Sequence, residues 1–141
     1  MKAERNRWRK FLHLPAGERM ILLEAVVLQM GIWLLLKLVP YKMLPRLFSD
    51  TDFKESSPET EKLKLIKNAV QRSSGVIRLH NRCLVSSLTA RCMLRRRNIP
   101  SKISLGVARG SGGKIRAHAW IIAGNFEVVE QMGDYTVLHV F

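Results

Sequence analysis

Residues 82–122 read RCLVSSLTARCMLRRRNIPSKISLGVARGSGGKIRAHAWII and change their periodicity half-way. The first part predicts a helix over about 82–97, because its apolar residues recur at helical spacing. Apolar and polar residues then alternate over 102–108 and 115–122, around a Gly-rich turn, which predicts two antiparallel strands. One face of the helix is expected to pack against the core, through Leu84, Val85, Leu88 and Cys92.

Two further helices precede this stretch and two further strands follow it. Hydrophobic spacing predicts helices over about 15–38 and 58–73, and alternation resumes over 126–130 and 135–141. We expect the four strands to form an antiparallel meander. Helices first and strands afterwards are typical of an α+β fold, in which N-terminal helices pack on one face of an antiparallel sheet.

The predicted helix over 15–38 is apolar on nearly every face. Glu24, Gln29 and Lys37 interrupt it, so we interpret it as buried or interfacial rather than as a membrane-spanning segment. Residues 49–61 hold five acids and one Lys among Ser, Thr and Pro, a composition typical of a solvated linker. We therefore divide the chain into an N-terminal helical segment (1–48), an acidic linker (49–61) and a core domain (62–141).

Composition favours one globular domain with a strongly basic surface. The chain has 141 residues, of which 47% are hydrophobic, and its net charge is +13. Such a charge attracts nucleic acid, anionic lipid or an acidic peptide, without choosing among them. Two cysteines are too few for a disulfide framework, and the polar first ten residues do not resemble a cleavable signal peptide, so we expect a cytoplasmic protein.

Cys83 and His118 are the residues most suited to covalent chemistry. Cys83 falls in the first turn of its predicted helix, after a potential cap at Asn81, where the helix dipole favours a thiolate. His118 lies in mid-strand, within the sequence AHAWI, so its ring is rigidly aimed. A His beside such a Cys could accept the thiol proton and later protonate a leaving amine, provided that a carboxylate holds its other nitrogen.

Three acids follow His118 and could supply that carboxylate, namely Glu127, Glu130 and Asp134. Alternation would turn Glu130 to the same face as Phe126 and Val128, whereas Glu127 would face the other side. Asp134 could be a turn residue. Spacing alone does not reduce these three candidates to one.

Several stretches together resemble the leader peptidase of lasso-peptide biosynthesis, a family of transglutaminase-like cysteine proteases. They are CLVSSL from Cys83, LRRRNIP from Leu94, LGV from Leu105, AHAW from Ala117, FLHLP from Phe11 before the Leu-rich helix, and YTVLHVF at the end. The resemblance covers nearly the whole chain and implies a papain-like or transglutaminase-like fold. Family members usually carry an Asp about a dozen residues after the His, and position 130 holds Glu here, so Glu130 is the third site residue that the resemblance implies.

The resemblance also implies a reaction and its partners. Cys83 would attack one peptide bond of a ribosomally made precursor, and His118 would transfer the proton, with no cofactor. A separate leader-recognition protein would deliver the precursor, and a macrolactam synthetase would then close the ring. The predicted helix over 15–38 either docks this partner or closes the core. The strongest basic field near the predicted site comprises Arg95, Arg96, Arg97, Lys102, Arg109, Lys114 and Arg116.

Two other functions remain open at this point. A basic binding module for nucleic acid or a membrane surface would explain the charge but gives Cys83 and His118 no role, and the chain lacks aromatic stacking motifs beside its basic runs. A transglutaminase-like amidase or acyltransferase would use the same Cys and His on another acyl donor. The spacing of His and Cys matches no zinc site, so no metal is expected.

Overall fold

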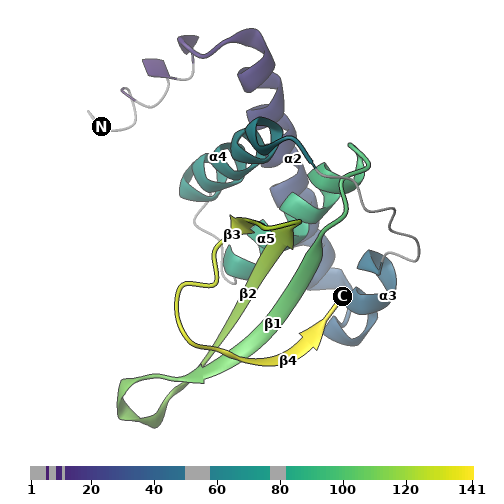
Figure 1. Ribbon diagram of the computed structural model, residues 1–141, viewed down its shortest axis with the longest axis vertical. Helices are drawn as coiled ribbons and strands as arrows, with labels where there is room; N and C mark the ends of the chain where they lie inside the picture. Colours follow the sequence, from purple (N-terminus) through teal and green to yellow (C-terminus); the bar gives the residue numbers. More distant parts are fainter. Residues whose placement is uncertain (1–5, 7–8, 11, 50–57, 77–81) are drawn as a thin grey trace.

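The computed structural model describes residues 6, 9, 10, 12–49, 58–76 and 82–141. Helices form one layer and a four-stranded antiparallel sheet forms the other, which confirms the α+β fold (Figure 1). The helices are α2 (Ala16–Leu38), η1 (Tyr41–Met43), α3 (Leu44–Phe48), α4 (Thr60–Val76), α5 (Arg82–Arg95) and η2 (Ser111–Gly113). The strands are β1 (Lys102–Arg109), β2 (Ile115–Ala123), β3 (Phe126–Val129) and β4 (Thr136–Val140).

The helix ends have local chemical causes. Helix α2 begins directly after Pro15, whose missing N–H costs little there. Helix α4 continues to Val76, beyond the predicted end at 73, and the Ser73 and Ser74 hydroxyls in its last turns donate to carbonyls within the same helix. Helix α5 ends at Arg95, two residues early, because Asn98 takes a left-handed conformation with φ of 53° and closes the last turn.

A short helical segment, η1 and α3, follows Pro40, where the sequence pattern predicted no helix. Pro45 lies in the first turn of α3, a position that tolerates proline. Leu44 and Phe48 of α3 are buried and extend the hydrophobic core. Pro40 and Pro45 therefore lie at the starts of η1 and α3, respectively.

The predicted meander is wrong in one respect. The strand order is β3-β2-β1-β4, so β4 pairs with β1 at the far edge and not with β3. The chain after β3 crosses the sheet before β4 begins (Figure 1). Backbone hydrogen bonds of 2.8 and 2.9 Å between Ile103 and Phe141 complete this pairing. Alternation along a strand predicts which residues share a face, but it does not select the neighbouring strand.

Helix α5 lies at the centre of the molecule, between α2, α4 and the sheet. The predicted single apolar stripe is wrong, because α5 is buried on nearly all sides, including the polar side chains of Ser87, Thr89 and Arg91. The guanidinium of Arg91 donates to the carbonyl of Ser101 and, over 2.9 Å, to that of Phe48. It thereby connects α3 to the start of the sheet.

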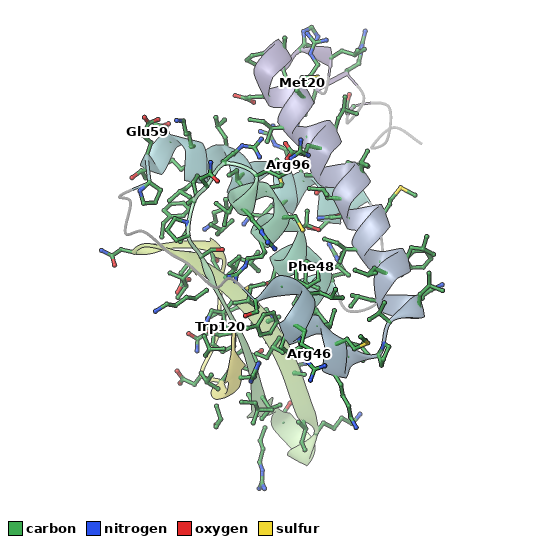
Figure 2. The ribbon with its side chains drawn as sticks, turned by 90° about the vertical axis from the view of Figure 1, so that its right-hand side faces the viewer. Met20, Arg46, Phe48, Glu59, Arg96 and Trp120 are labelled. Carbon is green, nitrogen blue, oxygen red and sulfur yellow. The ribbon has the colours of Figure 1, made fainter. Side chains whose placement is uncertain are left out.

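Helix α2 covers α4 and α5 and is fixed there by its polar residues. Both carboxylate oxygens of Glu24 accept hydrogen bonds from Arg97, at 3.1 and 2.7 Å, and Arg96 lies 3.3 Å away, beside α2 in Figure 2. Arg97 above all holds the pKa of Glu24 below its ordinary value. Gln29 is buried and donates to the carbonyl of Val70, over 3.2 Å. Two of the polar residues that interrupt the helix in the sequence, Glu24 and Gln29, thus attach it to the rest of the protein.

Candidate active site

Cys83 is the second residue of α5, as the sequence predicted. Its side chain is half-buried and packs against the hydrophobic core. The start of the helix is held by Arg82, whose guanidinium donates to the carbonyl of Ser74 in α4, over 2.8 Å. The predicted cap, Asn81, lies outside the residues that the structure describes. Cys83 therefore has the helix-start position that a thiolate nucleophile needs.

Cys92 lies near the other end of α5 and has a different environment. It is also half-buried, but burial raises the pKa of its thiol despite the neighbouring Arg95 and Arg91. A thiol with a raised pKa is a poor nucleophile at neutral pH. Burial therefore argues against Cys92 as the nucleophile.

His118 is half-buried on β2 and its ring contacts three residues. Nε2 lies 2.8 Å from the backbone carbonyl oxygen of Glu130. The ring also lies against Trp120 and Tyr135, with centroids 6.1 and 5.1 Å apart. Since a carbonyl oxygen only accepts, Nε2 carries a proton, and Nδ1 of the neutral ring keeps the lone pair. His118 is therefore held in the tautomer in which Nδ1 can act as a base.

Glu130 reaches His118 through its main chain and not through its carboxylate. The carboxylate binds Lys67 of α4 instead, with 2.5 Å between Oε1 and Nζ, and this contact lowers the pKa of Glu130. Glu127 and Asp134 are exposed, and neither is among the contacts of His118 within the described part of the chain. Residue 130 thus contacts the imidazole through a different atom from the one that the triad pattern suggests.

The face of the sheet that carries His118 also carries Trp120. Both alternate with Ala119 and Ile121, which pack in the hydrophobic core beneath the helices. Trp120 is buried at 3% exposure but lies outside that core. Its ring packs against Gly106, the register partner of His118. A Cβ at position 106 would lie 2.9 Å from the Trp120 ring, so the absence of a side chain there leaves the space that the ring occupies.

The structure brings His118 and Glu130 together, but it does not bring His118 to Cys83. His118 lies on the face of β2 opposite to Ala119 and Ile121, whereas Cys83 packs from α5 against the core that those two residues help to form. No hydrogen bond joins the two side chains among the residues with a described placement. Residues 77–81, which precede α5 in the sequence, lie outside the residues that the structure describes. Sequence reasoning missed Tyr135 and Lys67 as neighbours of the site, since nothing in their local pattern indicates a contact with a residue so distant in the chain.

The predicted basic field is divided between two places. Arg96 and Arg97 bind Glu24 of α2, so part of the field is neutralised. Four other cations are exposed on the β1–β2 hairpin, which extends beyond the helical layer in Figure 1: Lys102, Arg109, Lys114 and Arg116. In the part of the chain that the structure describes, no three His, Cys, Asp or Glu side chains gather as metal ligands would.

Comparison with known proteins supports the transglutaminase-like part of the resemblance. The sequence model of the transglutaminase-like superfamily matches residues 26–140, which is most of the chain and includes Cys83, His118 and Glu130. The match begins inside α2 and thus spans the predicted linker. Searches of curated proteins and of solved structures found no match. The chain belongs to the transglutaminase-like superfamily, whose chemistry is generally that of cysteine proteases and acyltransferases.

Proposed function

We propose that this protein is a cysteine endopeptidase that removes the leader from a ribosomally made lasso-peptide precursor. Cys83 is the nucleophile, His118 the general base, and Glu130 the residue that orients His118. The observation that carries the proposal is the 2.8 Å contact between Nε2 of His118 and the Glu130 carbonyl, within a transglutaminase-like domain that has a cysteine at a helix start. This contact leaves Nδ1 free to accept a proton.

The proposed reaction requires His118 and Cys83 to approach each other, so that Nδ1 of His118 takes the proton of the Cys83 thiol. The thiolate forms a bond to the scissile carbonyl carbon, the C–N bond breaks, and His118 returns the proton to the leaving amine. Water then hydrolyses the thioester, which releases the leader as a carboxylate and regenerates the thiol. The Cys83 backbone N–H, at the start of α5, supplies one hydrogen bond to the developing oxyanion.

Two partners belong to this proposal. A separate leader-recognition protein delivers the precursor, and a macrolactam synthetase consumes the amine that cleavage releases. The exposed cations of the β1–β2 hairpin, among them Arg109 and Lys114, suit a substrate with acidic residues. The protein is proposed to act in the cytoplasm, where its two free cysteines stay reduced.

The test is a cleavage assay with the purified chain and a precursor peptide, with and without the leader-recognition protein, followed by mass spectrometry. We expect Cys83→Ala and His118→Ala each to lower the rate on the order of 10³-fold or more. Cys92→Ala is the matched control, because it removes the other thiol of α5, and it should stay within about twofold of wild type. Glu130→Gln should have a small effect, because the backbone carbonyl remains in place.

A wild-type cleavage rate in Cys83→Ala would refute the peptidase. The superfamily also includes acyltransferase chemistry, which makes a transferase the second candidate. The masses separate the two: hydrolysis adds one water across two fragments, whereas transfer leaves a new covalent adduct. RNA binding that depends on salt and survives Cys83→Ala, without any cleavage, would instead favour the basic binding module.

A further inference from the structure

The outward face of α2 is a continuous apolar surface. Six large side chains along it are 50% to 75% exposed: Met20, Leu23, Val27, Met30, Leu34 and Leu38. At 100° per residue they fall within an arc of about 80°, and at 1.5 Å per residue they extend over about 27 Å. We call these six residues the apolar stripe. A soluble protein rarely exposes so large an apolar surface without a partner for it.

The other face of α2 is fixed to the protein. Ala25, Gln29 and Ile32 are buried there, roughly opposite the stripe on the helical wheel. Both acids of α2 have partners within the chain, Glu24 with Arg97 and Glu18 with Arg72. The helix therefore presents no unpaired carboxylate beside the stripe.

Cations flank the stripe at both ends, and further apolar residues follow its C-terminal end. Arg9 and Lys10 are exposed before α2. Lys37 lies over the Trp33 ring at 3.8 Å, and Lys42 and Arg46 are exposed just beyond. Tyr41, Met43 and Leu47 continue the apolar surface at 47% to 55% exposure. Apolar side chains, interfacial aromatics and flanking cations together are typical of helices that lie in a membrane interface.

We propose that the apolar stripe docks the protein on an anionic membrane surface, with α2 lying along the bilayer. Charge favours this occupant: two copies that each carry a net charge of +13 would repel each other, whereas anionic headgroups would neutralise the cations that flank the stripe. Among the described residues α2 is the one helix long and apolar enough to cross a membrane. Its contacts through Glu24 and Gln29 instead keep its inner face on the protein, so it lies on the surface.

Vesicle flotation with the full chain tests this inference. Wild-type protein should bind phosphatidylglycerol vesicles at least about tenfold more tightly than phosphatidylcholine vesicles, and salt should weaken the binding. Val27→Asp should lower the affinity about tenfold or more, and Lys42→Gln about fivefold. Leu138→Asp is the matched control, since Leu138 is 66% exposed but lies on β4, and its binding should equal that of wild type.

Absent binding to the anionic vesicles, equal binding to both kinds, or an equal loss in Leu138→Asp would overturn the inference. Light scattering would also overturn it by showing that the wild-type protein is a dimer and that Val27→Asp is a monomer. A second copy would then cover the stripe. A thermal melt of Val27→Asp that matches wild type shows that the variant is folded. Precursor cleavage in solution, without vesicles, should be unchanged in Val27→Asp, so failure of the docking surface is distinguishable from failure of the proposed peptidase.

Discussion

Helices α5 and α2 reverse the usual relation between apolar sequence and burial. Helix α5 contains Ser, Thr and Arg side chains, yet it is buried on nearly every side. Helix α2 is much richer in Leu, Val and Met, yet only 17% of its most apolar window is buried. The difference arises because α5 is enclosed by two helices and the sheet, whereas α2 is the outer layer. Apolar content thus predicts that a helix has a partner surface, but not whether that surface belongs to the same chain.

The largest expected contrast is in core packing. Leu88→Ala in α5 should lower the free energy of unfolding by about 3–5 kcal/mol, because Leu88 is fully buried and its loss leaves a cavity. Leu34→Ala on the apolar stripe should change it by about 0.5 kcal/mol or less. Urea unfolding of both variants measures the difference. Equal losses would show that the outer face of α2 is covered in solution and would break the comparison.

A second contrast concerns the buried cation of α5. Arg91→Met should cost about 2–4 kcal/mol, because the carbonyls of Phe48 and Ser101 lose a donor inside the protein. Arg91→Lys should restore only part of this, since an ammonium lacks the fork that reaches both carbonyls. The control is Arg96→Met, whose side chain is 67% exposed and should matter little. If chemical denaturation shows that Arg91→Met is as stable as wild type, these hydrogen bonds make no net contribution to the free energy of unfolding.

The smallest expected effect lies where α2 meets the turn that follows α5. Glu24→Gln should lower stability by about 1–2 kcal/mol at pH 7, because the bidentate contact with Arg97 is lost. Since the folded-state pKa of Glu24 is below its ordinary value of 4.5, this contribution is complete above that pH and is lost as pH falls through the lower folded value. Thermal melts from pH 3 to 7 should therefore show the two proteins converging in acid. Glu18→Gln, in a looser pair, should lower stability at pH 7 less than Glu24→Gln does, and a constant gap for Glu24→Gln at all pH values would contradict the assignment.

Local sequence patterns were sufficient to predict most of the helices and strands, but not which of them pack or pair with one another. The predicted helix over 15–38 corresponds to α2 at Ala16–Leu38, and the predicted first strand, 102–108, ends one residue before β1 does. Periodicity reports the conformation of each segment, because it depends on residues a few positions apart. It did not predict α3, which packs through Leu44 and Phe48 despite its proline, or the pairing of β4 with β1.

The candidate site shows the same division. Residue chemistry singled out Cys83 and His118, and the family resemblance pointed to position 130. Only the folded chain shows that Nε2 of His118 donates to the Glu130 carbonyl oxygen, while Lys67 binds the Glu130 carboxylate. The contact of His118 with Tyr135 had no sequence signal, because it depends on the path of the chain between β3 and β4.

The sequence by itself determined the α+β class, the helix-start position of Cys83, the mid-strand position of His118 and the basic charge of the chain. These follow from side-chain chemistry and from the short repeat of helices and strands. Tertiary structure alone decided the strand order, the enclosure of α5 and the exposure of the α2 stripe. These depend on which surfaces meet, and contacts between distant segments leave no periodic trace in the chain.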